Sequence, residues 1–430
     1  MSKEVKKRVW VIRTLNGNPF DDTQRAERAV RFAKYLDQQG YDVTFFGTAY
    51  IHAEKRYIAQ DTVRKKIANN EKVVLFHVPI VYKKNISIKR LIYGREIAHA
   101  LKKEIRNTER YPKPDIIFIS YPTDNDCRVA TWYGKKYNVP VIMDARDPWP
   151  DVFIEGLPKG LRTVGKITIN LLKHRVARTF KKADAICAMS PVMLRWALNY
   201  AGRERSKCDR SIFIAYDKVK VDESIYEDYL RELAKEDITE KTWNICYFAT
   251  LSRVNADINT VIKAIELVGQ KYPQIRLIIG GRGDEEEYIR SCIKDSPYIK
   301  MLGWLNQNQM TTIMNICKIS LLYTINNATI KNAWGNRVGQ YLSYGLPYVT
   351  CVDGVAKDYG IANSCGVFYQ EGDARDLAEK IIGIIENPNE LVIMSQNALT
   401  CYEKDFSSEV VMKQFETMIC SVIEEKGALK

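Results

Sequence analysis

The sequence lacks any long run of apolar residues. No window approaches the roughly 18 uninterrupted apolar residues that a membrane-spanning helix requires. The start, MSKEVKKRVW, also lacks the apolar segment of a secretory signal. These two absences predict a protein of the cytoplasm.

Metal-ligand patterns are scarce as well. The four histidines lie far apart, and the ten cysteines include no CxxC pair. Several cysteines fall inside apolar runs, where a thiol packs as a small hydrophobe: Cys187, Cys246, Cys317 and Cys351. We therefore expect reduced, buried thiols and no bound metal.

Two nucleotide-binding signatures are also missing. There is no Walker lysine and no full GxGxxG fingerprint, which disfavours P-loop enzymes and simple dinucleotide oxidoreductases. A shorter glycine loop, Gly280-Gly-Arg-Gly-Asp284, follows an apolar run and precedes a helical pattern. Its backbone amides could hold a phosphate while Arg282 adds charge, although glycines also end strands for purely geometric reasons.

Positive charge is abundant, with a formal net charge of +13. The densest block, residues 157–182, contains eight Lys or Arg and no acid, and its apolar residues recur at helical spacing. This pattern is typical of an interfacial helix drawn to an anionic membrane surface. A helix packed on its own domain with a solvated basic face is the competing interpretation. No basic stretch has interleaved aromatics, so nucleic acid is not an expected partner.

Apolar strand-like runs alternate with helical patterns along most of the 430 residues. Such alternation predicts an α/β protein of two facing, Rossmann-like, doubly wound lobes with a ligand cleft between them. We predict a first lobe over residues 1–217, a linker over 218–241 and a second lobe over 242–404. A C-terminal helix over 405–430 is expected to cross back to the first lobe.

Several polar residues follow predicted strands. Gly17 and Asn18 lie in the loop after the first strand, where glycine would let the backbone approach a ligand. Arg146 and Asp147 follow a later strand, in a stretch stiffened by two prolines, and could position a polar group; a structural ion pair is the alternative. The DxD-like run from Asp124 to Asp126 is interpreted as a surface loop.

The stretch NAWGNRVGQYLSYGLP, residues 332–347, places polar side chains at fixed helical offsets just beyond a buried strand. The candidate ligand-binding side chains in it are Asn332, Asn336, Arg337 and Gln340.

Four features, in this order and spacing, resemble the GT-B glycosyltransferases of family 4. They are the opening strand and glycine loop with RAERAVRFAKYLDQQGYDVT, the edge VPVIMDARDPWPD, the strand and loop LIIGGRGDEEE, and QYLSYGLPYVTC. The resemblance covers nearly the whole chain apart from residues 49–113 and the linker.

The resemblance implies retaining transfer of a sugar from a nucleotide-diphosphate donor, with a UDP-sugar expected, held mainly by the second lobe. The acceptor, a glycan or lipid-linked acceptor of cell-surface polysaccharide synthesis, would bind the first lobe. Asp147 and Arg146 would lie near the reacting centre as the candidate catalytic residues. Basic side chains would neutralise the leaving diphosphate without a metal or other cofactor.

The chain departs from the family pattern at charged positions. Amides, Asn332 and Gln340, stand where the family has the Glu pair that contacts the sugar and the ribose. Thr250 and Asn255 stand where it has the Arg and Lys that hold the diphosphate. The missing charge could come from Arg253, Arg282 or Arg337. These replacements keep a second hypothesis open, in which the chain is a catalytically silent homologue acting as a binding subunit or scaffold for a partner glycosyltransferase.

Overall fold

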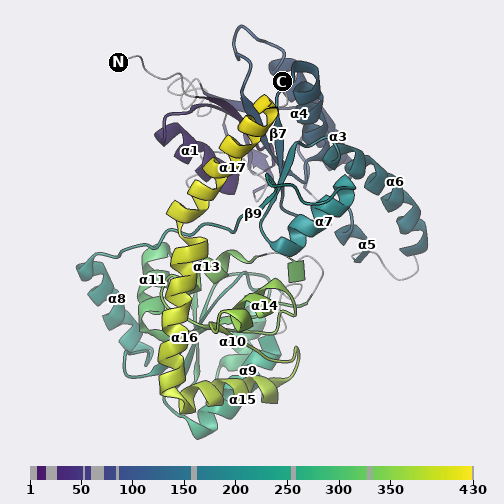
Figure 1. Ribbon diagram of the computed structural model, residues 1–430. Helices are drawn as coiled ribbons and strands as arrows, with labels where there is room; N and C mark the ends of the chain where they lie inside the picture. Colours follow the sequence, from purple (N-terminus) through teal and green to yellow (C-terminus); the bar gives the residue numbers. More distant parts are fainter. Residues whose placement is uncertain are drawn as a thin grey trace, which may run out of the picture. The chain divides into compact units, whose positions relative to one another are not determined.

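The computed structural model describes residues 7–15, 27–51, 54–59, 72–83, 87–155, 162–252, 258–326, 331–332 and 334–428. The chain divides into two compact units. Unit 1 is Met1–Ile212 with Met412–Lys430, and unit 2 is Phe213–Val411. Each unit is built on a parallel sheet with helices on both faces (Figure 1), which confirms the predicted α/β class of two Rossmann-like units.

Unit 1 contains a seven-stranded sheet in the order β5-β2-β1-β6-β7-β8-β9. All its neighbouring strands pair in parallel. The strands are β1 (Arg8–Ile12), β2 (Asp42–Thr48), β5 (Val73–Phe76), β6 (Ile116–Tyr121), β7 (Val141–Ala145), β8 (Ala185–Ala188) and β9 (Arg210–Ser211), with a separate antiparallel pair of β3 (Tyr50–Ile51) and β4 (Arg56–Tyr57).

The central strands β6 and β7 of unit 1 are buried along their whole length and mostly apolar, because helices cover both faces of the sheet. In β6, Ile117 and Ile119 join the core cluster that also contains residues of α3 and α4, on one face. The intervening Phe118 packs instead on Phe32 of α1 and Phe415 of α17, with ring centroids 5.1 and 5.6 Å away. Alternate side chains of one strand therefore build two separate cores.

Most helices of unit 1 lie in the first part of the chain, and one more, α17, lies at its C-terminal end. Ser190 accepts a hydrogen bond from the amide of Met193, with Pro191 in the first turn, so a capping serine and a first-turn proline set the start of α7. The helices are α1 (Arg28–Gln38), α3 (Ile88–Glu104), α4 (Asp124–Tyr137), α5 (Val152–Glu155), α6 (Arg162–Phe180), α7 (Pro191–Ala201) and α17 (Ser408–Ala428).

Unit 2 contains a six-stranded parallel sheet in the order β12-β11-β10-β13-β14-β15. The order reverses between β10 and β13, which is the point where open α/β sheets bind ligands at the carboxyl ends of the strands. The strands are β10 (Trp243–Phe248), β11 (Ile275–Gly280), β12 (Ile299–Gly303), β13 (Cys317–Leu322), β14 (Tyr348–Thr350) and β15 (Gly366–Phe368).

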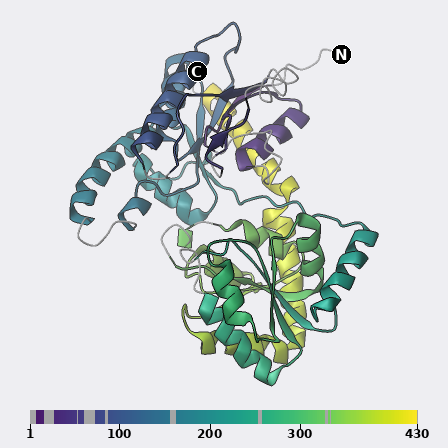
Figure 2. The same cartoon turned by 180° about the vertical axis from the view of Figure 1, so that it is seen from behind.

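The helices of unit 2 surround this sheet, as the view from behind also shows (Figure 2). They are α8 (Glu223–Lys235), α9 (Ile258–Lys271), α10 (Glu286–Ile293), α11 (Gln307–Ile316), α13 (Asn336–Leu342), α14 (Val355–Ala362), α15 (Ala374–Glu386), α16 (Pro388–Cys401) and the π-helical turn η2 (Tyr402–Phe406).

Two sequence predictions need correction at the junction of the units. The first lobe, predicted over residues 1–217, ends instead at Ile212, because Phe213 already packs on Phe406 of unit 2, with ring centroids 5.1 Å apart. The segment predicted as a linker, 218–241, is instead part of unit 2. It contains α8, whose Tyr229 and Leu233 are buried in a core cluster that includes residues of α11.

Candidate functional site

The loops after β10 and β11 form the carboxyl edge of the sheet of unit 2. The amide of Leu251 donates to the carbonyl of Arg282 over 3.0 Å, and the amide of Gly281 donates to the carbonyl of Gly303 over 2.7 Å. Gly281 has a φ of +147°, and a Cβ there would lie 1.9 Å from the carbonyl oxygen of Ala249. Only glycine allows these loops to pack so closely, so they form one fixed surface.

The glycine loop after β11 leaves donors available at this edge. In the described part of the chain, the amides of Arg282, Gly283 and Asp284 donate to no carbonyl, and the Arg282 side chain is exposed without an ion pair. Consecutive free amides beside a guanidinium can hold an anion. Four acids in a row, residues 284–287, follow directly and weaken the positive potential.

Helix α13 places Arg337 near the end of β10. The Tyr341 hydroxyl accepts a hydrogen bond from the amide of Phe248 over 3.0 Å, which fixes α13 against that strand end. Burial raises the pKa of Tyr341, so its hydroxyl stays neutral. The Arg337 guanidinium lies 6.0 Å from the Phe248 ring centroid and donates to Gln340 Oε1 over 2.7 Å. Gln340 is only 3% exposed, so its amide positions Arg337 and offers little surface to a ligand.

The other predicted residues of unit 2 lie around this edge. Thr250 and Asn336 are exposed, and Asn332 is half-buried. Arg253 lies outside the described residues, as do Gly17 and Asn18 of unit 1. The structure therefore brings Arg337 and Gln340 into contact, and the topology brings Thr250 and Arg282 to the same edge of the sheet.

Sequence reasoning missed a carboxylate at this edge. Glu371, just after β15, accepts from the amide and the side-chain nitrogen of Asn326, each over 2.9 Å. The Asn326 side chain also donates to the carbonyl of Cys351 over 2.7 Å and accepts from the amide of Asp353 over 2.8 Å. The sequence signal for it was weak. Glu371 and Gly372 follow a short apolar run, and an acid followed by glycine is equally typical of an ordinary turn.

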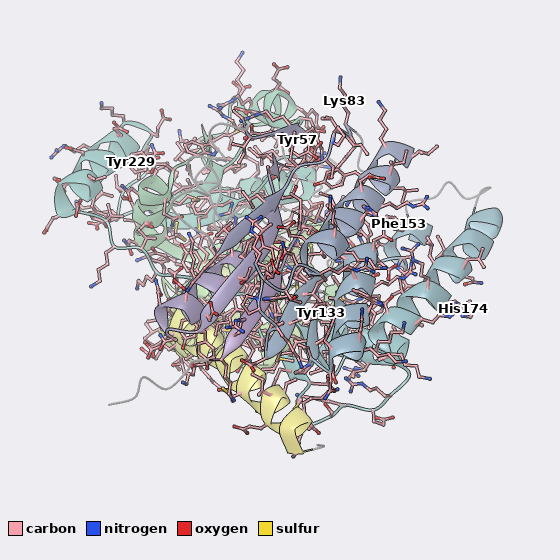
Figure 3. The ribbon with its side chains drawn as sticks, turned by 90° about the horizontal axis from the view of Figure 1, so that it is seen from above. Tyr57, Lys83, Tyr133, Phe153, His174 and Tyr229 are labelled. Atoms are coloured by element: carbon pink, nitrogen blue, oxygen red, sulfur yellow. The ribbon has the colours of Figure 1, made fainter. Side chains whose placement is uncertain are left out.

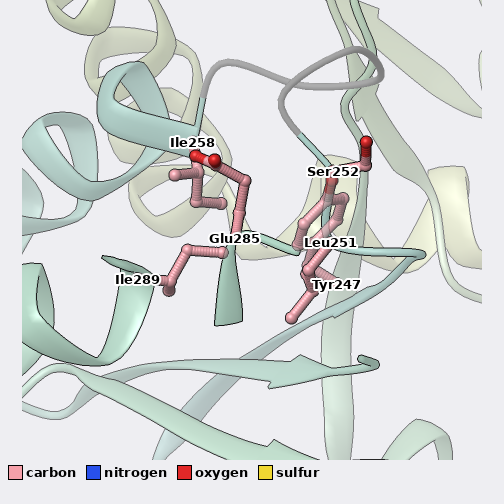
Figure 4. A pocket seen from close by; sticks show the side chains of 6 residues that line it. All are labelled: Tyr247, Leu251, Ser252, Ile258, Glu285 and Ile289. Carbon is pink, nitrogen blue, oxygen red and sulfur yellow. The ribbon is translucent and has the colours of Figure 1, made fainter. Parts of the chain in front are cut away.

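A small cavity lies beside the loop after β10 (Figure 4). Its volume is about 10 Å³, close to the space of one water molecule. A nucleotide needs far more room, so this cavity is not the site of one. The lining residues are Tyr247, Leu251, Ser252, Ile258, Glu285 and Ile289.

In unit 1, Arg146 is held by an acid that the sequence did not single out. Glu27 binds the Arg13 guanidinium over 2.6 Å and also pairs with Arg146. Burial alone would raise the pKa of Glu27, but the charges of Arg13 and Arg146 hold it below its ordinary value. The structural ion pair weighed for Arg146 is therefore present, with Glu27 and not Asp147 as its partner.

Asp147 has a different environment. Its carboxylate is half-buried and makes no hydrogen bond or ion pair within the described ranges. It lies in the field of Arg146 and of Arg90, whose guanidinium is 4.8 Å from the Trp149 ring centroid. A carboxylate without a hydrogen bond beside cations can accept hydroxyl protons from a ligand.

The DxD-like run is not the predicted surface loop. It forms the first turn of α4, and Asp126 is buried, accepting a hydrogen bond from the Thr14 hydroxyl at the end of β1. Burial raises the pKa of Asp126 to about 7, although hydrogen bonds from Thr14 and Thr123 oppose the shift. This carboxyl can therefore gain or lose a proton near neutral pH.

The basic segment 157–182 forms α6 from residue 162, with 157–161 outside the described residues. Val176 and Phe180 pack into unit 1, and Arg175 binds Asp124 over 2.6 Å. Leu171 and Leu172 remain exposed. The helix thus packs on its own unit, as one interpretation expected, and also exposes apolar residues, as the interpretation of a membrane-surface helix expected.

In the part of the chain that the structure covers, no three His, Cys, Asp or Glu side chains are grouped as metal ligands. Among the same residues, no helix has both the length and the apolar content to cross a bilayer.

These two parallel sheets, each with charged side chains at its carboxyl edge, define a protein of two Rossmann-like units. Comparison with known families agrees. The family "Glycosyltransferase Family 4" matches residues 26–209, and "Glycosyl transferases group 1" matches residues 229–400. No curated protein matches the sequence.

Solved structures also share the fold. The crystal structure of Anabaena Alr3699/HepE in complex with UDP is 15% identical, covers 96% of this chain and 100% of its own, and has a TM-score of 0.66. Sucrose-phosphate synthase from Thermosynechococcus elongatus is 12% identical over 98% and 100% of the two chains, with a TM-score of 0.66. A putative UDP-N-acetylglucosamine 2-epimerase from Listeria monocytogenes is 12% identical over 98% and 97%, with a TM-score of 0.59.

At these identities the solved structures show the fold alone. The two family matches identify the class of enzyme, the glycosyltransferases. The chain belongs to the GT-B, family 4-like glycosyltransferases.

Proposed function

We propose that the chain transfers a sugar, with retention of anomeric configuration and without a metal, from a nucleotide-diphosphate donor to a glycan or lipid-linked acceptor of cell-surface polysaccharide. The observation that carries this proposal is the Arg337 guanidinium, fixed by Gln340 and Tyr341 at the end of β10. The structure of HepE with UDP, and a second one with UDP-glucose, support a UDP-sugar as the donor.

In the proposed reaction, the bond between the anomeric carbon and the diphosphate oxygen breaks, and a bond to an acceptor hydroxyl oxygen forms. The diphosphate gains negative charge, which Arg337 and Arg282 neutralise. The acceptor hydroxyl gives its proton to the departing diphosphate oxygen as the new bond forms. Asp147, whose carboxylate is available, binds the acceptor hydroxyl in unit 1.

Gln340 acts through Arg337 in this scheme. A neutral amide accepts the Arg337 hydrogen bond without cancelling its charge, whereas a glutamate at 2.7 Å would form an ion pair. The amide therefore keeps the guanidinium available to an anion. Glu371, on the same sheet edge, supplies a carboxylate that sugar hydroxyls can bind.

The alternative is a catalytically silent homologue that binds a glycan or nucleotide as a subunit of a partner glycosyltransferase. One observation favours it. Gln340, at the position of the family's ribose contact, is buried, and its side-chain oxygen already accepts a hydrogen bond from Arg337. Thr250, at a position of diphosphate charge, contributes none.

The test is nucleotide binding and donor hydrolysis. Calorimetry with UDP, GDP and dTDP should detect one preferred nucleotide, and Arg337→Ala should weaken its binding about 10- to 150-fold, the loss of one charge-assisted hydrogen bond. The control is Arg290→Ala, which removes an exposed arginine paired with Glu286 on α10. Slow release of that nucleotide from its sugar conjugate would support catalysis. Unchanged affinity in Arg337→Ala, with no hydrolysis of any donor, would favour the silent subunit.

The proposal also places the protein in the cytoplasm, in peripheral contact with the membrane through residues 157–182. Exposed Leu171 and Leu172 support this contact. Arg175 forms an ion pair with Asp124, and Lys173 forms one with Asp151, so these two cations add less positive charge to the surface of the segment.

A further inference from the structure

A second exposed apolar surface lies at the start of α3. Ile88, Leu91 and Ile92 are 76%, 69% and 43% exposed, and Val81, just before the helix, is also exposed. Side chains at spacings of three and four share one helix face. Ile88, Leu91 and Ile92 therefore form an exposed apolar patch, which we call the α3 patch, and such patches mark interaction sites.

The α3 patch is not an uncovered part of the core. The opposite face of the same helix packs Tyr93, Ile97 and Leu101 into unit 1, where all three are buried. Helix α3 therefore has two apolar faces, and only one of them is buried in the core of unit 1. The other face is available to a partner.

The charges around the α3 patch favour an anionic partner. Lys89 and Arg95 are exposed on the helix, and Lys83 precedes it (Figure 3). Further along the outer face of α3, the same spacing reaches Lys102, about 21 Å from Ile88. Arg106 follows just after the helix ends at Glu104. Glu96 is an exposed acid on this helix.

The basic end of α3 surrounds a tryptophan. Lys102, Arg106 and Lys136 of α4 lie 4.8, 5.1 and 5.5 Å from the ring centroid of the half-buried Trp132. Three like charges around one indole repel one another and are stabilised by an anion. Apolar side chains at one end with lysine, arginine and tryptophan at the other are typical of segments that lie in the lipid headgroup region.

We propose that the outer face of α3 binds an anionic lipid surface, with Ile88, Leu91 and Ile92 entering the headgroup layer and the basic residues binding lipid phosphates. This contact is additional to the one through 157–182. It does not depend on sugar transfer, because lipid binding is measured without a donor.

The test is flotation of the full chain with vesicles of phosphatidylcholine, alone or with phosphatidylglycerol. The wild-type protein should float with the anionic vesicles. The triple variant Ile88→Ser/Leu91→Ser/Ile92→Ser should lose about tenfold or more in affinity, because the three side chains no longer leave water on binding. Lys89→Gln/Arg95→Gln should reduce the preference for phosphatidylglycerol.

Two matched controls make the result specific. Val392→Ser/Ile393→Ser removes another exposed apolar pair, 68% and 60% exposed on α16 of unit 2, and should float like the wild type. Leu171→Ser/Leu172→Ser tests α6 alone. If only the α6 variant loses binding, or if the α3 triple variant floats normally, the proposal is wrong.

The competing occupant is a second copy of the chain. Light scattering across a range of protein concentrations distinguishes it: a wild-type dimer that the triple variant converts to a monomer, with no vesicle binding by either, would overturn the lipid proposal. Donor hydrolysis measured without vesicles should be unchanged in the triple variant. A failure of the glycosyltransferase proposal would therefore appear separately.

Discussion

Polar residues at the carboxyl edges of the two sheets hold arginine side chains in different ways. In unit 1, the buried Arg13 and the half-buried Arg146 both pair with the half-buried Glu27, which balances two guanidinium groups. In unit 2, Gln340 holds Arg337 with a neutral amide. The first arrangement fixes its cations, and the second leaves one available to an anion, which is why we assign the diphosphate to unit 2.

Asp126 gives a prediction at this scale. Its folded pKa is about 7, whereas an unfolded aspartate titrates near 4. The folded state binds more protons between these values, so its contribution to stability is complete below pH 4 and is lost as the pH rises to 7. The free energy of unfolding of the wild type, relative to Asp126→Asn, should fall by about 1.4 kcal/mol per pH unit in that window.

Urea denaturation at a series of pH values, followed through the transition of unit 1, measures this difference. The Asn variant provides the reference because its amide does not titrate and has nearly the shape of the protonated acid. A difference between the two proteins that stays constant from pH 4 to pH 7 would show that Asp126 is ionised throughout.

Among the elements, the paired loops after β10 and β11 require a glycine at position 281. The Ala249 carbonyl lies where a side chain of residue 281 would begin, and neighbouring backbone bonds join the two loops. Because the backbone on both sides is fixed, neither loop can move away without breaking hydrogen bonds. The position of Arg282, between these bonds, follows from the same constraint.

Three glycine-to-alanine variants separate the causes. Gly281→Ala should destabilise unit 2 by about 3 kcal/mol or more, through steric overlap and strain together. Gly372 has a φ of +79° but open space around it, so Gly372→Ala should cost about 1–2 kcal/mol from strain alone. Gly383, in α15 with open space, should stabilise by about 0.5–1 kcal/mol when changed to Ala.

Thermal and urea unfolding of the three variants, with nucleotide binding measured in parallel, provide the check. Only Gly281→Ala should also weaken nucleotide binding, because it displaces Arg282. If Gly281→Ala and Gly372→Ala cost the same, the close approach of the loops contributes nothing to stability.

The elements themselves were largely readable from the sequence. Strands such as β1, β10 and β11 are mostly apolar runs between helical patterns, and such runs leave few alternatives to a buried strand. Site residues were less readable. Arg337 and Arg282 were expected because they follow strands, but Glu27, Asn326 and Glu371 were missed, since each acquires its role from a contact distant in sequence.

At the scale of the whole molecule, the chain returns to its first unit. Unit 1 is completed by α17, whose Phe415 packs on Phe32 with ring centroids 4.5 Å apart. Polar contacts fasten the end of α17: Cys208 donates to Glu425 over 2.7 Å, and Lys426 binds Asp184 over 2.7 Å. The buried apolar residues that α17 brings to unit 1 are Met412, Phe415, Met418, Ile419 and Val422.

The energetic consequence is large. Burial of each large apolar side chain stabilises by about 1.5–3 kcal/mol, so these residues of α17 contribute roughly 7–15 kcal/mol to unit 1. The whole stability of a typical domain is about 5–15 kcal/mol. Unit 1 therefore should not remain folded without the last segment of the chain, although that segment follows all of unit 2.

Unit 2 is continuous in sequence, so the two units predict opposite behaviour as fragments. A fragment of residues 213–411 should show native-like circular dichroism and a cooperative thermal transition, because its sheet and the helices around it are complete. A fragment of residues 1–212 should lack such a transition and aggregate, since Phe32 and Phe118 lose the helix that covers them. Adding a peptide of residues 408–430 should restore the transition, whereas the same peptide with Phe415→Ser should not. If the 1–212 fragment is monomeric and unfolds cooperatively without the peptide, unit 1 is already stable without α17.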